Sequence, residues 1–460
     1  MNERGIDSEI ERLIEKAQEA VEVSDWGRVI ITCDEILRRD PKQEDALFLA
    51  GTAFLSGANP GLALQMFNTA RQATSDQRKL AAIWNNIGAC LQDNHPDEAY
   101  KALMKALEYG EPRETYDNLC NVASQIGRHA EALEWADKSE QESRKDASYN
   151  RSFALFSLGR WKEAWAAFDK AVPNRDGAAR SFGFPRWNGK SGRPVIHGEQ
   201  GIGDEILFLS MLPKDFDGVI ECNARNVGLV QRSFRNASVY GTIGENVIDW
   251  CEIEEPTHEI EMGGLGTLFA PEPYRRGGFL KADPAKVAMF KAWLDGAAKS
   301  PIRIGVAWTG GSWSTGRMRR SLPFEDAQRL LTIPGVTTVC LEYDDRTKLL
   351  EPWKHVLYPK WAVQKGSDMD DLAALVSSLD LVIAPTTSIV DLCGALGVPC
   401  WAMVDAHPQW RYSPLAGKDQ MWFYENVRTF RQKPDEKTWG RVVNEIRKAI
   451  AERWPQEKAA

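Results

Sequence analysis

The sequence lacks any C-x-x-C pair and any cysteine and histidine cluster with zinc-ligand spacing, although it has eight cysteines. This argues against the common structural zinc sites, which need closely spaced thiolate and imidazole ligands. Cysteines scattered along apolar patterns are typical of small buried side chains in a reducing compartment. A chain of 460 residues can bury several cores and needs no disulfide bonds for stability.

Long apolar segments and a surplus of basic charge are also lacking. No uncharged apolar run reaches the ~18 residues that would span a bilayer. The charged segment at 1–13 lacks the apolar core of a signal peptide. We therefore expect a cytoplasmic protein without a membrane span. The net charge of −8 argues against a general nucleic-acid binder, because such proteins carry basic surfaces.

A sequence motif recurs through residues 1–173. Its small or aliphatic anchor returns at steps of 34, 36, 33 and 32 residues, at Val29, Ala63, Ala99, Ala132 and Ala164. This period resembles that of the tetratricopeptide repeat (TPR) family, in which helical hairpins stack and leave a concave surface. We expect about five hairpins, with Tyr100, Tyr116 and Tyr149 on the concave surface. The alternative is an unrelated helical bundle.

Beyond this region, an aperiodic segment at 174–193 is rich in Gly, Pro, Ser and Arg and predicts a linker. Short β-branched runs then alternate with helical patterns, which is typical of parallel sheets covered by helices. We expect two Rossmann-like domains, at 194–298 and 299–460, that face a cleft. The final amphipathic helix is expected to pack back across the first domain. The predicted strands are 194–199, 218–223, 238–243, 303–308, 337–343, 379–385 and 399–404.

Two segments that follow predicted strands carry candidate chemistry. In HGEQGIGDEILF, Gly201 and Gly203 let the backbone approach a ligand, and Asp204 starts a helix. The alternative for Asp204 is a simple helix N-cap. In GVAWTGGSWSTGRMRRSLP, a loop containing Gly310 leads to three arginines, whose guanidinium groups suit a diphosphate. The alternative is a solvated basic loop.

A third segment, LDLVIAPTTSIVDLCGALGVP, places Thr386, Thr387 and Ser388 between a predicted strand and an apolar helix. Hydroxyl groups and free N–H groups at a helix N-terminus form an anion site. The alternative is a simple Ser/Thr cap. Since all three segments lie at carboxyl ends of predicted strands, we expect them to open onto one cleft, with a carboxylate, cations and a phosphate-ready helix end.

The C-terminal half, from Trp187 to Gln432, resembles bacterial proteins that join TPRs to a glycosyltransferase unit of the ADP-heptose:lipopolysaccharide heptosyltransferase type. The resemblance rests on the three segments above together with PRWNG and with HPQWRYSPL followed by VRTFRQ. It implies the two-domain architecture called GT-B and sugar transfer from a nucleotide-sugar donor, with inversion at the anomeric carbon and without a catalytic metal or cofactor.

The resemblance also implies roles for individual residues. Asp204 matches the general base on the acceptor side, and Arg320, beside Arg319, matches the residue that contacts the donor phosphates. The phosphate-cradling turn is matched by Thr387 and Ser388. The chain departs from the family at two positions of this turn: Thr386 replaces an aspartate and Asp391 replaces a histidine. A carboxylate such as that of Asp391, at a helix start, would repel phosphate.

These observations favour a glycosyltransferase that modifies a hydroxyl of a protein acceptor, with the repeats gripping that protein. A flagellin-like surface polypeptide, modified before export, is the acceptor that we consider first, by analogy alone. One alternative is transfer to a glycan, a lipid-linked precursor or a nucleic-acid base. Another is a non-catalytic scaffold that retains the fold, which the residues at 386 and 391 favour. The sequence names neither the sugar nor the nucleotide.

Overall fold

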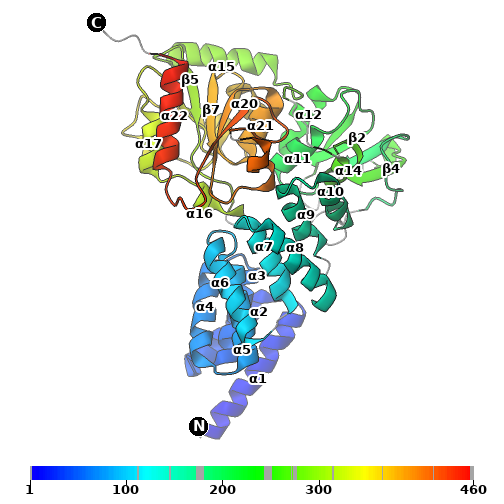
Figure 1. Ribbon diagram of the computed structural model, residues 1–460, viewed down its shortest axis with the longest axis vertical. Helices are drawn as coiled ribbons and strands as arrows, with labels where there is room; N and C mark the ends of the chain where they lie inside the picture. The colour runs from blue at the N-terminus through cyan, green and yellow to red at the C-terminus, as the bar shows by residue number, and fades with distance from the viewer. Residues whose placement is uncertain are drawn as a thin grey trace. The chain divides into compact units, whose positions relative to one another are not determined.

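The computed structural model describes residues 3–110, 113–143, 147–171, 181–242, 251–270, 272, 277–312, 315–364, 366–417 and 419–455. The chain divides into two compact units, residues 1–151 and 152–460, and each is described by itself (Figure 1). Among the helices of these described ranges, none has the length and hydropathy that crossing a bilayer requires.

The first unit is a row of antiparallel helical hairpins in which each helix packs on its neighbours in sequence. This confirms the predicted helical repeat. Its helices are α1 (Glu3–Glu22), α2 (Trp26–Arg39), α3 (Glu44–Ser56), α4 (Pro60–Ala73), α5 (Gln77–Leu91), α6 (Pro96–Tyr109), α7 (Arg113–Gln125), α8 (His129–Lys138) and the π-helix η1 (Ser139–Ser143), and α9 (Ser148–Ser157) begins in it.

Small residues where paired helices cross explain the repeat. All five anchors, from Val29 to Ala164, are fully buried. A Cβ on Gly51 would lie 2.7 Å from the ring of Phe67, and one on Gly88 would lie 2.6 Å from Leu103. The two glycines therefore let α3 approach α4 and α5 approach α6, closer than any larger residue would allow.

Two of the three tyrosines expected on a concave surface are core residues instead. Tyr100 is buried, and its hydroxyl donates to Glu131. Tyr116 is also buried and stacks on Trp135 with ring centroids 6.0 Å apart. Their phenol rings fill the space between successive hairpins, and the sequence pattern does not distinguish this use from an exposed one.

The second unit contains two parallel sheets, and the fold class is as predicted. The first has the strand order β3-β2-β1-β4 and the second β6-β5-β7-β8-β9, with every neighbouring pair parallel. The strands are β1 (Pro194–His197), β2 (Val219–Asn223), β3 (Ser238–Thr242), β4 (His258–Glu261), β5 (Arg303–Val306), β6 (Thr337–Cys340), β7 (Leu381–Pro385), β8 (Cys400–Val404) and β9 (Val427–Arg431).

All seven predicted strands are present, and two further strands complete the sheets. Both extra strands, β4 and β9, carry charged residues and lie at sheet edges, so they lack the apolar run that marks the others. The predicted linker, 174–193, lies partly outside the described residues, at 174–180. Its described part runs beside β4, where the Trp187 N–H donates to the Glu259 carbonyl over 2.8 Å.

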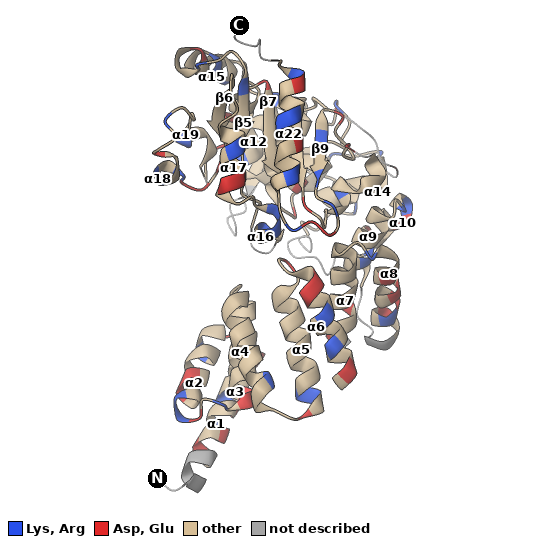
Figure 2. Cartoon of the chain, turned by 60° about the vertical axis from the view of Figure 1, so that its left-hand side comes forward, with Lys and Arg blue, Asp and Glu red and all other residues tan. Residues whose placement is uncertain are grey.

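Helices cover both faces of the second sheet (Figure 1). On one face, α17 (Phe324–Leu331) and α22 (Gly440–Arg453) lie side by side, and their apolar residues share a core with β5, β7 and β8. The final helix was predicted to pack across the first domain, but Val442, Val443 and Ile446 belong to this core of the second domain. Figure 2 shows the charged residues of α22 along its outer side.

The helices of this unit beyond α9 precede, connect or follow its strands. They are α10 (Trp161–Lys170), α11 (Ile202–Leu209), η3 (Ala224–Asn226), α12 (Val227–Ser233), α13 (Cys251–Glu254), η4 (Met262–Gly264), α14 (Leu265–Phe269), α15 (Pro284–Ala297), α16 (Arg317–Arg320), α17 (Phe324–Leu331), α18 (Thr347–Leu350), α19 (Lys360–Val363), α20 (Met369–Val376), α21 (Ser388–Leu396), η6 (Trp410–Tyr412), η7 (Pro414–Ala416) and α22 (Gly440–Arg453).

The last repeat helix, α10, is part of this second unit, whereas the sequence places it with the array. Trp165 of α10 packs edge-on against Phe208 of α11 and against Trp410 of η6. A Cβ on Gly266 of α14 would lie 2.4 Å from the Trp165 ring. The α10 segment has the anchor pattern of the other repeats, so the sequence does not show that its aromatic residues face the α/β unit.

Replacing Gly266 tests this packing. Gly266→Ala places a methyl group inside the buried Trp165 ring, and we expect the second unit to lose about 1–3 kcal/mol of unfolding free energy. Gly296→Ala in α15 is the matched control, since a Cβ there meets open space. The control should be neutral or more stable by up to about 1 kcal/mol. Equal melting temperatures for the two variants would show that α10 does not pack there.

Candidate functional site

A cavity of about 560 Å³ lies within the second unit, between its two sheets. Its wall includes the start of α11 and the loop after β5. The loop after β6, the start of α21 and η6 also contribute, together with residues of η3, α19 and α20. Because parallel strands present their carboxyl ends at one edge, the residues that follow β1, β5, β6 and β7 meet here. The expectation that the three segments open onto one cleft agrees with this arrangement.

A buried arginine that the sequence analysis does not single out, Arg411, lines the cavity. Arg411 donates through Nη2 to Oδ1 of Asp204 and through Nη1 to Oδ2 of Asp391, the latter over 3.3 Å. The Arg411 side chain is 9% exposed and that of Asp391 4%, whereas Asp204 retains 27% exposure. Arg411 thus joins a carboxylate from each of the two α/β domains.

Burial shapes the charges of this cluster. Burial raises the pKa of Asp391 to about 7, against the lowering effect of Arg411. Burial alone would lower the pKa of Arg411, but the carboxylates of Asp204 and Asp391 outweigh it and raise that pKa. The guanidinium therefore remains charged, while the buried carboxyl group of Asp391 exchanges its proton near neutral pH.

The sequence suggests that the Asp391 carboxylate would face and repel a phosphate, but in the structure this carboxylate has a cationic partner. Asp391 lies in the first turn of α21 and borders the cavity, but its Oδ2 holds Arg411. A charge-compensated carboxylate repels an anion far less than a free one does. A role for Asp391 in donor binding stays a prediction.

The two predicted glycines do different things. Gly201 is the N-cap residue of α11 and lines the cavity. Gly203 is the second residue of the helix, where a Cβ would be 2.9 Å from Oδ2 of Asp391 and 3.2 Å from Cα of Ser388. Glycine at 203 therefore lets α11 pack directly on α21, which brings Asp204 beside Arg411.

The predicted basic loop is the short helix α16, whose arginines appear blue in Figure 2. Arg320 borders the cavity but is only 4% exposed, and it donates to the Thr386 carbonyl and the Thr315 hydroxyl. Burial lowers the pKa of Arg320. A Cβ on Gly310 would lie 2.4 Å from that of Arg320, so the glycine lets this arginine pack against the loop.

Arg319 differs from Arg320 in its environment. Arg319 donates to the His407 carbonyl over 2.9 Å and pairs with Asp405 over 3.3 Å. It does not contribute to the described wall of the cavity, whereas Arg317 does. Of the three arginines in this helix, the structure therefore brings Arg317 and Arg320 to the cavity.

The hydroxyl-bearing residues form the junction of β7 and α21. Thr386 is buried, and Thr387 is the N-cap residue of α21. No described side chain hydrogen bonds to the first turn of α21 as a cap, since the Thr387 hydroxyl donates instead to the Pro385 carbonyl over 3.3 Å. Ser388 begins the helix and borders the cavity. The start of α21 is thus uncapped by the described side chains, and its use as an anion site stays a prediction.

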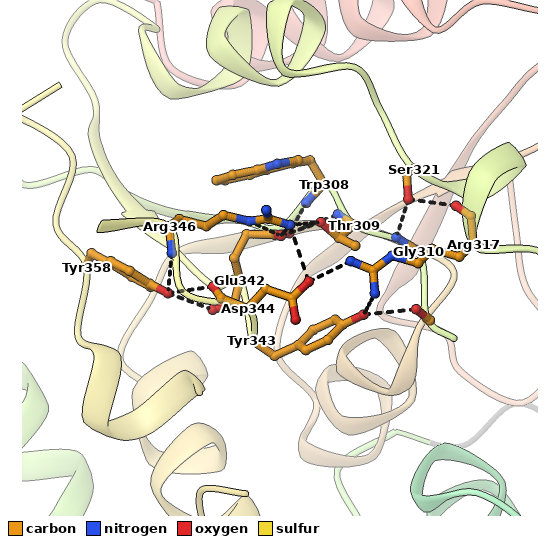
Figure 3. A network of polar contacts seen from close by, with 11 residues as sticks. Trp308, Thr309, Gly310, Arg317, Ser321, Glu342, Tyr343, Asp344, Arg346 and Tyr358 are labelled. Carbon is orange, nitrogen blue, oxygen red and sulfur yellow. Dashed lines mark hydrogen bonds and ion pairs between the residues drawn. The ribbon is translucent and has the colours of Figure 1, made fainter. Parts of the chain in front are cut away.

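A polar network that sequence reasoning missed fixes the loop after β5 (Figure 3). Glu342, which is fully buried, accepts from the N–H groups of Trp308 and Thr309 over 2.7 and 2.8 Å, and from Arg346 over 2.9 Å. Beside it, the Tyr343 hydroxyl donates to the Gly311 carbonyl over 2.9 Å. These bonds hold the loop that carries Gly310 and leads to Arg320.

The same network places Arg317 at the cavity. Its Nη2 donates to Asp344 over 2.6 Å and its Nη1 to the Tyr343 hydroxyl over 3.1 Å (Figure 3). The only sequence signal for these partners is their position at the end of the predicted strand 337–343.

Two aspartates at the start of α20, Asp368 and Asp370, have structural partners. Asp368 caps α20 by accepting from the Asp370 N–H. Both carboxylate oxygens of Asp370 accept from Arg232 of α12 over 2.7 Å. This bond joins the two α/β domains. Within the described ranges, no group of three or more His, Cys, Asp or Glu residues lies close enough to hold a metal ion.

No protein-family model matches the chain. A relative in sequence is Protein FlbA of Caulobacter vibrioides, 26% identical over 462 residues, which span 84% of this chain and 76% of that protein. A solved structure that matches is an O-GlcNAc transferase mutant of Thermobaculum terrenum, with a TM-score of 0.39 and 14% identity over 99% of this chain and 94% of that one. Another is Pseudomonas aeruginosa PilF, with a TM-score of 0.31 and 22% identity over 36% of this chain and 78% of that one.

Similarity at these levels assigns no family. The heptosyltransferase type that the motifs resemble therefore stays a prediction, as do the roles of the individual site residues.

The raised pKa of Asp391 predicts a pH dependence of stability. The unperturbed aspartate pKa is about 3.9, so between about pH 4 and 7 the native state holds a proton that the unfolded state has lost. We expect the unfolding free energy of the wild type, relative to Asp391→Asn, to fall by up to about 1.4 kcal/mol per pH unit across this window and to level off above it. Denaturant titrations at several pH values measure this, and a difference independent of pH would contradict it.

Proposed function

We propose that the protein is a glycosyltransferase that moves a sugar from a nucleotide-sugar donor to a hydroxyl group of a protein acceptor. The observation that carries the proposal is the meeting of Asp204, Arg320, Arg411 and the uncapped start of α21 around one cavity at the carboxyl ends of two parallel sheets. This combination offers a proton acceptor beside an anion site, which is what sugar transfer from a diphosphate requires.

Two buried nitrogens support an anionic ligand. Among the described residues that line the cavity, Nε of Arg320 and Nε of Arg411 are the buried nitrogens without a hydrogen-bond partner. A buried donor without a partner is costly, and functional sites account for many such groups. A diphosphate would supply oxygens to both arginines and to the N–H groups at the start of α21.

The proposed reaction divides its work between two sides of the cavity. Asp204 accepts the proton of the acceptor hydroxyl as its oxygen attacks the anomeric carbon. The bond from that carbon to the diphosphate breaks, and Arg320, Arg411 and the helix end offset the charge of the leaving group. Attack opposite the leaving group inverts the anomeric configuration.

The helical array supports a protein acceptor in this proposal. Arrays of stacked hairpins present extended surfaces that suit extended or helical peptides. Contacts remote from the reacting hydroxyl raise its effective concentration at the base. A flagellin-like surface polypeptide is the acceptor that we test first.

A label-transfer experiment tests the acceptor class. The full-length protein is incubated with a cell extract and nucleotide sugars labelled on the sugar. Label that becomes soluble after protease treatment supports the proposal. Label that is released by nuclease, or that moves into organic solvent, contradicts the protein acceptor and leaves the transferase in place.

A donor screen tests the proposal before any acceptor is known. Nucleotide sugars with different bases are added to the full-length protein, and the melting temperature is recorded, because a ligand that binds only the native state raises it. Release of nucleoside diphosphate then measures slow transfer to water. If no nucleotide sugar stabilises the protein or is hydrolysed, the chain is a scaffold and the proposal fails.

Asp204→Asn tests the proposed base. The amide keeps the shape of the side chain but accepts no proton, so we expect the turnover to fall by about 10²–10⁴ while the nucleoside diphosphate still binds. Asp215→Asn is the matched control, an exposed aspartate outside the cavity wall, and its turnover should equal that of the wild type. A turnover near the wild-type value in Asp204→Asn would remove this residue as the base.

Chelation tests whether the guanidinium groups replace a metal. Arg320 and Arg411 provide two positive charges at the cavity, and the carboxylate of Asp370 binds Arg232. We therefore expect turnover to be unchanged after treatment with a chelator. Loss of turnover that is restored by manganese would contradict a metal-independent mechanism.

A further inference from the structure

The ion pair between Arg411 and Asp204 has a consequence for the proposed base. Oδ1 of Asp204 already accepts a hydrogen bond from Arg411. An ionised carboxylate has about four lone-pair sites on its two oxygens, so a guanidinium hydrogen on Oδ1 occupies one of these sites and fixes the orientation of the group. In the structure described here, Asp204 is therefore only partly available for the chemistry that the proposed function gives it.

The packing of Trp410 fixes the backbone beside Arg411, whereas the Arg411 guanidinium lies between two carboxylates. The preceding residue, Trp410, stacks on Phe156 with ring centroids 4.4 Å apart and packs edge-on against Phe423 at 5.7 Å. The guanidinium reaches Asp204 on one side and Asp391 on the other, and its Nε has no partner among the described residues. It borders the same cavity as Arg320 and the start of α21.

We propose that Arg411 is a latch that couples donor binding to the release of Asp204: it holds Asp204 when the cavity is empty and turns to the diphosphate when a donor binds. This inference rests on the proposed function. A diphosphate carries more charge than one carboxylate and binds a guanidinium through two oxygens, so it competes effectively for Arg411. Asp391 keeps the guanidinium at the cavity during the exchange.

The latch predicts an unusual effect on binding. A donor must first withdraw Arg411 from Asp204, so removing the Asp204 charge should tighten nucleoside diphosphate binding. We expect Asp204→Asn to lower the Kd by at least about tenfold, the factor for one charge-assisted hydrogen bond. Loss of simple charge repulsion between Asp204 and the diphosphate would also tighten binding. The same substitution in a variant that lacks Arg411 separates the two effects.

The experiment is a double-mutant cycle measured by calorimetry on the full-length protein. The probe is whichever of UDP, GDP, ADP and CDP binds the wild type most tightly. The cycle comprises the wild type, Asp204→Asn, Arg411→Gln and the double variant. The latch predicts that Asp204→Asn tightens binding only where Arg411 is present. An equal gain in the Arg411→Gln background indicates repulsion alone and overturns the latch.

A second background covers the case in which Arg411→Gln does not fold, because that change leaves Asp391 buried without its cation. Arg411→Gln combined with Asp391→Asn removes both charges and keeps both shapes, and the cycle is repeated in it. If the wild type binds none of the four nucleotides, the proposed function fails and the latch with it. If the wild type binds but the cycle shows no coupling, the latch alone fails.

Discussion

The charge of the buried Arg411 is the constraint on which the site depends. An uncompensated guanidinium in a protein interior is costly, so the fold must bring carboxylates to it. These carboxylates are Asp204 of the first α/β domain and Asp391 of the second. Gly203 allows this, because a larger residue would separate α11 from α21. The contacts that bring the two α/β domains together therefore also arrange the residues of the site.

The same arginine explains why the last repeat helices belong to the α/β unit. Trp410 places the backbone of Arg411 by packing among Phe156, Trp161 and Trp165, which come from α9 and α10. Each of these aromatic side chains buries a large apolar area and has few rotamers to lose. A boundary drawn where the periodic pattern ends would cut through this cluster, so a shortened chain would need to retain both helices.

The sequence predicts the features that repeat or alternate locally. The anchors from Val29 to Ala164 mark the hairpins because close helix crossings demand small residues at a fixed period. The apolar strands can likewise be recognised from the sequence, whereas β4 and β9 cannot, because their charged residues interrupt the apolar pattern. Arg411 could not be found this way, since its partner Asp204 lies 207 positions earlier in the chain. The burial of Tyr100 and Tyr116 could not be predicted either. A tyrosine side chain suits a surface or a core, and the packing of the helices determines which it occupies.

The central claim is that a nucleoside diphosphate binds between Arg320, Arg411 and the start of α21, opposite Asp204. The most direct measurement is a crystal structure of the full-length protein grown with the nucleoside diphosphate that binds most tightly. The account predicts phosphate oxygens within hydrogen-bond distance of Arg320, Arg411 and the N–H groups at the start of α21, with Arg411 no longer bonded to Asp204. A nucleotide bound elsewhere, or one bound here while Arg411 stays on Asp204, would contradict it.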